Sequence, residues 1–216
     1  MLKKLGYDVT LLYLESGRTY LSKGYLKEAK KLVDKNLQRL QPFLNENLPI
    51  IGLEPSAILS FRDEYKRLNN NKPLLEKLEN SSFLIEEFLA EEIKKGAITS
   101  DNFTAAAKTI KIHNHCHQKA LSNQKVTFDV LNLPKNYNVT IIASGCCGMA
   151  GSFGYEKEHY KTSMAVGELK LFPAVRKSDA NTIIAANGTS CRHQIFDGTK
   201  RKAFHPVSIL RQALLI

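Results

Sequence analysis

The sequence repeats one order of β-rich run, glycine-containing turn and long helix, and this repeat limits the possible folds more than any other feature. Residues 7–12 (YDVTLL) match residues 137–142 (YNVTII), and residues 22–25 (SKGY) match residues 152–155 (SFGY). Short β-rich runs that alternate with longer helical patterns are typical of parallel sheets covered by helices. We therefore expect an α/β protein built from two pseudo-repeated strand–turn–helix modules with mainly parallel sheets.

The two modules are expected to span residues 1–96 and 97–216. The second module opens with a strand near residues 109–114, and the counterpart of this strand would fall before residue 1, so the first module is predicted to be truncated. It is also predicted to be degenerate, because every cysteine lies in the second copy. The places that match Cys146, Cys147 and Cys191 are occupied by Glu15, Ser16 and Ala57.

Local patterns predict the elements of the first module. Residues 9–14 read as a strand, and residues 26–40 as an amphipathic helix that Pro42 stops. Residues 69–73 (NNNKP) read as a loop by composition. Residues 82–95 read as a strongly amphipathic helix, with leucine, isoleucine and phenylalanine on one face and glutamate on the other.

Composition places the chain among ordinary globular proteins. It has 216 residues, 43% of them hydrophobic and 24% charged, which excludes a disordered polymer. No apolar run approaches about 20 residues, so no transmembrane helix is expected. Asp8 and Glu15 interrupt the N-terminal apolar stretch, which argues against a signal peptide. The expected location is the cytoplasm, either free or peripheral to the inner face of the membrane through a partner.

The positive charge is concentrated in the second module. The chain carries a net charge of +10, and residues 97–216 supply +8 of it through 15 basic and 7 acidic side chains. The basic residues are scattered apart from residues 200–202, and no tryptophan is present, so nucleic-acid binding is a weak hypothesis. A solvated basic surface, a bound anionic group and an acidic protein partner are the alternatives.

The four cysteines stand in equivalent places. Each follows a predicted strand at the point where the chain turns into a helix; they are Cys116, Cys146, Cys147 and Cys191. The carboxyl ends of parallel strands meet at one edge of a sheet, so these residues are expected to converge. Helix N-termini and turn amides stabilise thiolates, and Gly145 and Gly148 let the backbone wrap closely around a bulky group. Thiolates are soft ligands that suit iron–sulfur clusters or zinc.

Other roles for the cysteines compete with a cluster. Small apolar core residues, a disulfide framework and a catalytic thiol with a histidine base are each less consistent with four cysteines at equivalent strand ends. A zinc site is possible if a histidine replaces one of the adjacent cysteines, because two neighbouring residues reach one small ion only with strain. The histidines available for this are His115, His117 and His193. His113 and His115 are expected to be satisfied edge histidines.

These stretches resemble the cysteine-rich CCG domain. HCHQKAL, SGCCGMAGSFGYEKEHY, GELKLFPAVR and GTSCRHQI carry the resemblance in the second module, and GLEPSAILSFRDEY and GRTYLSKG carry it in the first. The CCG domain occurs in the heterodisulfide reductase B subunit, in glycolate oxidase iron–sulfur subunits and in the C subunit of anaerobic glycerol-3-phosphate dehydrogenase. The chain most resembles the C-terminal region of FAD-linked D-lactate and D-2-hydroxyglutarate dehydrogenase-type oxidases.

The resemblance implies electron transfer. It implies one iron–sulfur cluster, of the 4Fe-4S type, or zinc, held by the four cysteines. It implies FAD on a partner domain or subunit, because no flavin-binding region is present. The residues expected around the ligands are His115, His117, Lys119, Gly145, Gly148, Arg192 and His193. The family pattern ends in CxxC, and Gly188 stands where its first cysteine would be.

Two functions are therefore predicted. In the first, the chain is an electron-transfer domain or subunit of an FAD-dependent 2-hydroxy-acid oxidoreductase, and is not a complete enzyme alone. In the second, it is a zinc-binding structural or partner-docking module with no redox role.

Overall fold

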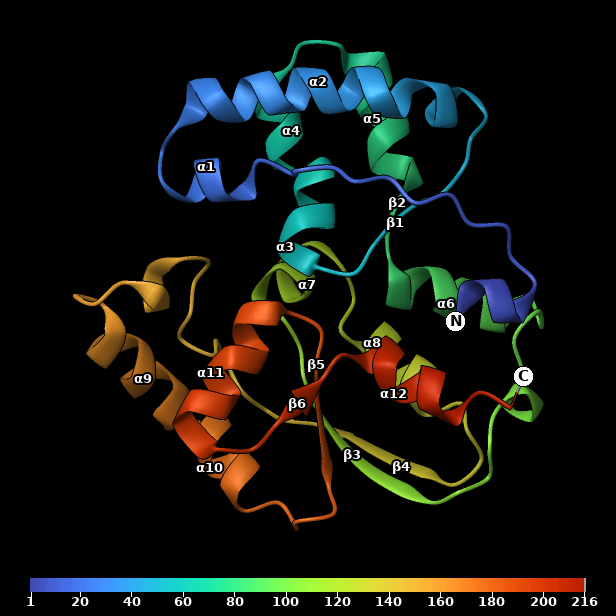
Figure 1. Cartoon of the computed structure of the whole chain (residues 1–216), viewed down its shortest axis with the longest axis vertical. Coiled ribbons are helices and arrows are strands. Elements are labelled where there is room, and N and C mark those ends of the chain that lie inside the picture. The colour runs from blue at the N-terminus through green and yellow to red at the C-terminus, as the bar shows by residue number, and fades with distance from the viewer. Residues whose placement is uncertain (216) are drawn as a thin grey trace. The chain divides into compact units, whose positions relative to one another are not determined.

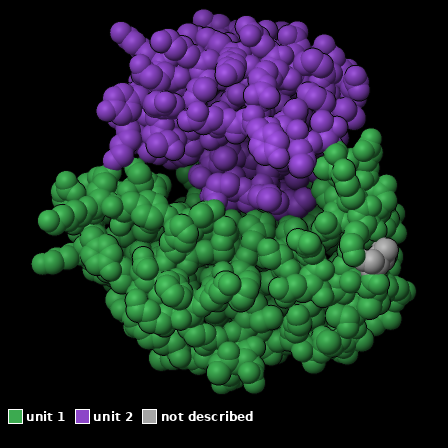
Figure 2. Space-filling model, in the orientation of Figure 1, with its two compact units in different colours: residues 1–9, 86–216 green, residues 10–85 purple. Residues whose placement is uncertain are grey.

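The computed structural model describes residues 1–215 and divides them into two compact units. Unit 1 holds residues 1–9 and the chain from residue 86 onward, and unit 2 holds residues 10–85 (Figure 2). Each unit has its own sheet and helices. The division of the sequence into modules at residues 96 and 97 stays a prediction.

Unit 1 is organised around a parallel sheet that has four strands among the described residues. Strand β3 (Lys108–His113) lies between β4 (Tyr137–Ile141) and β5 (Ile183–Ala186), and β6 (Ala203–Phe204) completes the order β4-β3-β5-β6 (Figure 1). The chain moves from β3 to one side to form β4, and then crosses back over β3 to form β5. Ligand sites of open α/β sheets lie where the strand order reverses in this way, outside the carboxyl ends of the strands.

The register brings three strand ends into line. Ile112 near the end of β3 lies opposite Ile141 on β4 and Ala185 on β5, and His113 lies opposite Ala186. Because parallel strands run in the same direction, the segments that leave β3, β4 and β5 start side by side. This edge of the sheet is where the cysteine-bearing turns begin.

Helices cover both faces of the sheet in unit 1. The helical elements are η1 (Leu2–Leu5), α6 (Ile85–Lys94), η3 (Ser100–Asn102), α7 (Cys116–Leu121), α8 (Lys125–Leu131), η4 (Phe153–Tyr155), α9 (Tyr160–Leu169), α10 (Leu171–Arg176), α11 (Thr189–Thr199) and α12 (Pro206–Ala213). Ile184 and Ala186 of β5 pack with Phe172 of α10 and Ile195 of α11 in one buried cluster. Helices α8 and α12 contact each other, and they also contact β4 and β5, respectively.

Unit 2 packs helices around a short sheet. Strands β1 (Ile50–Gly52) and β2 (Ser82–Leu84) pair in parallel among its described residues. The helices are α1 (Arg18–Ser22), α2 (Leu26–Asn45), α3 (Pro55–Ile58), η2 (Leu59–Phe61), α4 (Glu64–Leu68) and α5 (Lys72–Ser81). Helix α2 buries Val33, Leu37, Leu40 and Leu44, which recur at helical spacing and face α4 and α5.

The predicted α/β class with mainly parallel sheets is confirmed. Of two glycine pairs matched in the sequence, Gly24 has a positive φ and Gly154 does not, whereas the other pair agrees. Gly17 and Gly148, matched in the sequence, both adopt the left-handed conformation, with φ of +78° and +101°. Glycine reaches this conformation without the steric cost that other residues bear. Gly17 is the N-cap of α1, and Gly148 lies in the turn between β4 and η4.

Four local predictions need correction. Residues 9–14 form no strand within the described chain, because β1 and β2 pair with each other and no ladder partner reaches this segment. Helix α2 continues through Pro42 to Asn45, since Leu44 is fully buried and holds the last turn in place. Residues 82–84 pair with β1, so the predicted helix of residues 82–95 starts later, as α6.

The fourth correction concerns the polar run at residues 69–73. Its second half is the start of α5. The Asn71 side chain accepts a hydrogen bond from the backbone N–H of Leu74 at 3.2 Å, and Pro73 lies in the first turn. Asparagine at an N-cap and proline in the first turn both favour the start of a helix. The segment therefore has the composition of a loop but contains the boundary of a helix.

Candidate metal centre

Three neighbouring strand ends supply the cysteines. Cys116 follows β3 as the first residue of α7, and Cys191 lies in the first turn of α11, which follows β5. Cys146 and Cys147 lie in the turn after β4. The predicted placement of each cysteine between a strand and a helix, or in the turn that follows a strand, agrees with the structure.

Each of the four thiols has another of them among the groups that shift its pKa, and we call the four residues the sulfur cluster. Cys147 Sγ donates to Cys191 Sγ across 3.4 Å, and Cys116 and Cys147 are the neighbours that lower the pKa of Cys146 most. None of the four forms a disulfide. Cys147 and Cys191 are buried, while Cys116 and Cys146 are half-buried. The cluster therefore has an inner pair and an outer pair.

Thiol and thiolate character alternate along the cluster. Hydrogen bonds from Cys116 and then Cys147, helped by the backbone N–H groups of Gly148 and Ala150, hold the pKa of Cys146 far below its usual range. The hydrogen bond from the Cys147 thiol lowers the pKa of Cys191 in the same way. Burial of Cys191 would raise this pKa, but His113 and His115 add to the lowering.

The two donating thiols shift in the opposite direction. The pKa values of Cys116 and Cys147 are raised. The main cause is the hydrogen bonds to the neighbouring thiolates, and burial adds to the rise. Negative charge is thus stabilised on two of the four sulfurs without any external cation. Deprotonated sulfur is the form that binds metal.

His113 joins the inner pair. One of its ring nitrogens, Cys147 Sγ and Cys191 Sγ all lie within 4.8 Å of one another. Its Nδ1 is 2.8 Å from Ser144 Oγ, while Nε2 is buried and has no hydrogen-bond partner among the described residues. The expectation that His113 is a satisfied histidine is therefore wrong for Nε2. Sequence reasoning could have noticed that His113 is the last residue of β3, at the edge where the cysteines meet.

These atoms fit a metal or a cluster. Two thiolates on one tetrahedral ion, each at about 2.3 Å, are roughly 3.8 Å apart, so the 3.4 Å between Cys147 and Cys191 is close to what such an ion needs. A buried, unpaired imidazole nitrogen is costly unless something binds it. The donor set of thiolates and imidazole suits zinc or iron.

His115 occupies the space beside Gly188. Its Nδ1 accepts a hydrogen bond from the backbone N–H of His117 at 3.1 Å and so caps α7. A Cβ on Gly188 would collide with the His115 ring and would lie 3.2 Å from Cys191 Sγ. Because residue 188 has no side chain, the His115 imidazole has room to pack against its backbone. The His117 ring lies 5.4 Å from that of His115, between centroids.

The predicted neighbours Lys119 and Arg192 hold the turns that lead into the cysteines, and the charge of Lys119 also opposes the rise in the pKa of Cys116. Lys119 Nζ donates to the carbonyl oxygens of Ser144 at 2.6 Å and Gly145 at 2.8 Å, just before Cys146. Arg192 Nη1 donates to two carbonyl oxygens at the end of β5, those of Ala186 and Asn187, each at 2.9 Å. Both cations fix backbone that leads into a cysteine.

Gly148 and His193 have different surroundings. A Cβ on Gly148 would collide with the Ser163 carbonyl, and the Gly148 N–H donates to Cys146 Sγ across 3.2 Å. Glycine here therefore lets the backbone approach a sulfur. His193 is exposed, and its Nδ1 is 2.7 Å from the Tyr155 hydroxyl.

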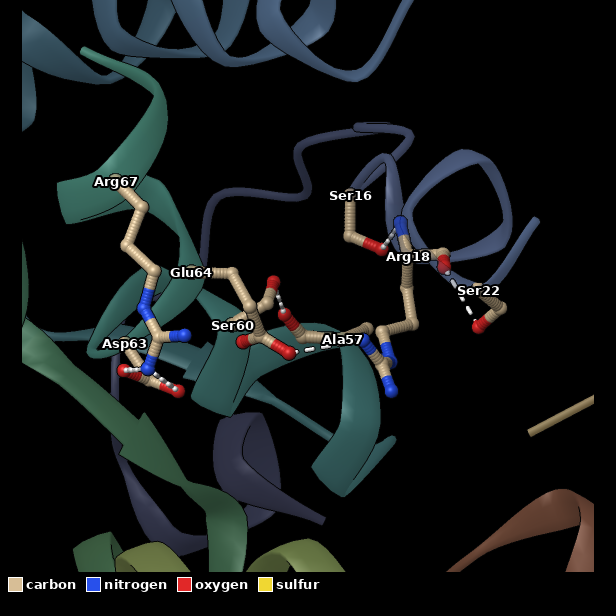
Figure 3. A network of polar contacts seen from close by, with 8 residues as sticks. All are labelled: Ser16, Arg18, Ser22, Ala57, Ser60, Asp63, Glu64 and Arg67. Atoms are coloured by element: carbon tan, nitrogen blue, oxygen red, sulfur yellow. Dashed lines mark hydrogen bonds and ion pairs between the residues drawn. The ribbon is translucent and has the colours of Figure 1, made fainter. Parts of the chain in front are cut away.

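In unit 2 a polar network stands at the places that match the cysteines. Ser16 Oγ accepts from the backbone N–H of Arg18 at 3.3 Å, and Arg18 Nη1 lies 2.8 Å from Glu64 Oε1 (Figure 3). Ala57 lies in the same network, and its carbonyl accepts from Ser60 Oγ at 2.6 Å. At these positions the structure has an ion pair and hydrogen bonds, and the degeneracy of the first module stays a prediction.

Comparisons with known proteins place the chain beside dehydrogenases and their subunits. It is 28% identical over 223 residues to the C subunit of anaerobic glycerol-3-phosphate dehydrogenase from Escherichia coli K12, covering 99% of this chain and 53% of that protein. It is 27% identical over 218 residues to D-2-hydroxyglutarate dehydrogenase of the same strain, covering 99% of this chain and 20% of the enzyme. The enzyme of that name from Pseudomonas putida KT2440 is 29% identical over 215 residues, covering 97% of this chain and 20% of the enzyme.

The chain thus spans about half the length of the dehydrogenase subunit and a fifth of the dehydrogenases. No family model matches the chain, and no solved structure matches it. Within residues 1–215, no helix has both the length and the apolar character needed to cross a bilayer. The similarities support a role associated with oxidoreductases.

Proposed function

We propose that this chain is an electron-transfer domain or subunit of an FAD-dependent 2-hydroxy-acid oxidoreductase and holds one iron–sulfur cluster. The observation that carries the proposal is the convergence of Cys116, Cys146, Cys147 and Cys191 from three adjacent strand ends without a disulfide. The similarity to dehydrogenases supports an oxidoreductase partner, and the CCG resemblance supports iron and sulfide as the bound group.

The four cysteines would hold the cluster, which, when bound, takes up and releases single electrons. The chain's own residues would set its environment. The Gly148 N–H donates to the Cys146 sulfur and so stabilises added negative charge. Burial of Cys147 and Cys191 keeps water from the inner side, and half-exposure of Cys116 and Cys146 leaves an outer side near the surface.

The partner in this proposal carries the flavin and the substrate site. Electrons would pass from a flavin that oxidises a 2-hydroxy acid to the cluster and then to a downstream acceptor. The docked partner would lie on the Cys116 and Cys146 side, because electron transfer favours short distances and these two thiols are only half-buried. The complex is proposed to lie in the cytoplasm, free or peripheral to the membrane.

The test is anaerobic purification of the chain, with reconstitution by iron and sulfide, read by iron, sulfide and zinc analysis and by visible absorption. Stoichiometric iron and sulfide with a broad band that bleaches with dithionite is the expected result. Cys146→Ser and Cys191→Ser should each lower the iron content by more than about tenfold. Ser190→Ala, next to Cys191, is the matched control and should keep the band.

A zinc-binding structural or docking module is the second candidate. It is favoured by the His113, Cys147 and Cys191 group, whose spacing suits one tetrahedral ion. A colourless protein with one zinc, unchanged after reconstitution, would overturn the electron-transfer proposal and support this one.

A further inference from the structure

Two histidines that are close in the chain, His113 and His115, lie beside the sulfur cluster. His113 and His115 are both buried, and each has its Nδ1 in a hydrogen bond. The partners differ in kind: Ser144 Oγ for His113 and the backbone N–H of His117 for His115. A backbone N–H can only donate, whereas a hydroxyl can donate or accept, so the two rings are constrained differently.

On His115, Nδ1 must be the acceptor, because the His117 backbone N–H can only donate. A neutral His115 therefore carries its proton on Nε2. That nitrogen is on the side of the ring that faces Gly188, where a Cβ would lie 3.2 Å from both His115 Nε2 and Cys191 Sγ. His115 in this form offers an N–H to its surroundings and has no free nitrogen lone pair for a metal.

On His113 the partner of Nδ1 is a hydroxyl, which can donate or accept, so the contact allows the opposite tautomer. Ser144 Oγ lies 2.8 Å from His113 Nδ1 and also donates to the Ile142 carbonyl at 3.5 Å. With its own hydrogen directed to that carbonyl, Ser144 accepts the Nδ1 proton of His113. Nε2 then carries a lone pair, is buried, and has no hydrogen-bond partner in the described part of the chain.

We propose that His113 binds the metal centre directly through Nε2, alongside Cys147 and Cys191, and that His115 is a positioning residue that does not bind it. The inference rests on the proposed function only in that a metal centre occupies the sulfur cluster. Ser144 acts through His113: it holds the tautomer whose Nε2 is free to bind. A hydrogen bond to the far nitrogen of a metal-bound histidine is the usual means of fixing its tautomer and orientation.

The experiment measures nitrogen bound to the centre. The full chain, labelled with ¹⁵N-histidine, is reconstituted with iron and sulfide and reduced, and a parallel metal-free sample is loaded with Co²⁺ alone. Pulsed electron paramagnetic resonance separates a directly bound nitrogen, with a large coupling to the electron spin, from one that only hydrogen-bonds to a sulfur. The wild-type chain should show the large coupling.

The variants assign the coupling. His113→Gln should lose it, while His115→Gln, the matched control, should keep it. His113→Cys should restore metal retention without the nitrogen coupling, which a merely structural role for His113 would not produce. Ser144→Ala should keep the coupling and weaken metal retention by about tenfold. Circular dichroism of His113→Gln checks that the chain still folds.

The outcomes separate this inference from the proposed function. A cluster with no large nitrogen coupling, or a coupling lost in His115→Gln and kept in His113→Gln, would overturn the inference and leave electron transfer standing. Failure to bind iron and sulfide, with Co²⁺ bound through His113, would overturn the iron–sulfur function and support the inference. Failure to bind either would overturn both.

Discussion

The His115 imidazole fills the volume that a side chain at Gly188 would occupy. Gly188 has an ordinary negative φ of −79°, so its backbone alone does not require glycine. The requirement comes from His115, which is buried and fixed as the cap of α7. The two residues are coupled although they belong to different strand ends.

Gly188→Ala should therefore destabilise the chain by about 1–3 kcal/mol, because the added methyl group overpacks a buried site. The measurement is urea unfolding of the metal-free chain. Gly145→Ala is the control, since no atom lies within 4 Å of a Cβ built there. A double variant with His115→Ala should recover most of the loss, and an additive double variant would contradict the coupling.

In the metal-free chain, Cys146 should be the first cysteine to react with iodoacetamide. Hydrogen bonds from Cys116 and Cys147 lower its pKa, which favours the reactive thiolate, and it is half-buried rather than enclosed. Its reaction rate should stay high below the pH at which an ordinary thiol loses reactivity. Peptide mapping by mass spectrometry measures the order of modification.

Cys116 is the internal comparison for this prediction, because it is equally half-buried and its pKa is raised. Faster modification of Cys116 than of Cys146 would contradict the prediction, because it would place the proton on Cys146 and the thiolate on Cys116.

Glu64→Gln should destabilise unit 2 by about 1–3 kcal/mol, since it removes a charged hydrogen-bond partner from the partly buried Arg18 guanidinium. The side chains of Arg18 and Glu64 are 27% and 17% exposed, so solvent screens the pair less than it screens a surface pair. Denaturant unfolding gives the value. Glu91→Gln, which breaks an exposed pair with Lys94, should change stability by less than about 1 kcal/mol. Equal effects of the two variants would argue against a structural role for the network in Figure 3.

Tyr65 should make stability fall as the pH rises above 10. Burial, partly opposed by the hydrogen bond from Asn36, raises the pKa of Tyr65 to about 12. Between pH 10 and 12 the unfolded chain has released this proton and the folded chain has kept it, so unfolding becomes easier, by about 2–3 kcal/mol in total. Unfolding free energies measured across this range, with Tyr65→Phe for comparison, isolate the effect.

Tyr65→Phe should itself cost about 1–3 kcal/mol near neutral pH, because the hydroxyl also donates to the Ser16 carbonyl at 3.0 Å. Its pH dependence above 10 should be flatter than that of the wild type. The exposed Tyr13→Phe is the control and should retain the wild-type slope. If the dependence of stability on pH above 10 is unchanged in Tyr65→Phe, the effect does not come from Tyr65.

The approximate position of the four cysteines could be predicted from the sequence because it follows from one geometrical rule. Each cysteine follows a strand, and parallel strands end at one edge, so convergence needs no knowledge of side-chain packing. The register of β3, β4 and β5 confirms the rule. The buried Nε2 of His113, which has no hydrogen-bond partner among the described residues, could not be predicted, because neither composition nor spacing reveals its packing.

The errors in unit 2 have related causes. The segment at residues 9–14 has the composition of a strand, but a strand exists only with a backbone partner, and pairing is not a local property. The run at residues 69–73 has the composition of a loop, but Asn71 there caps α5. Intrinsic propensity describes a segment alone, and in both places the neighbouring chain decided the outcome.

The central position of β3 affects the order in which the chain can be synthesised, folded and loaded with a metal. Cys147 and Cys191 are 44 residues apart, and they meet only when β5 has paired with β3. Cys191 leaves the ribosome after the other three cysteines, so no nascent fragment without it carries all four. An ion captured early would find only part of the coordination that we propose and could be exchanged. Loading of the proposed centre is therefore expected to be completed only after β5 has paired with β3.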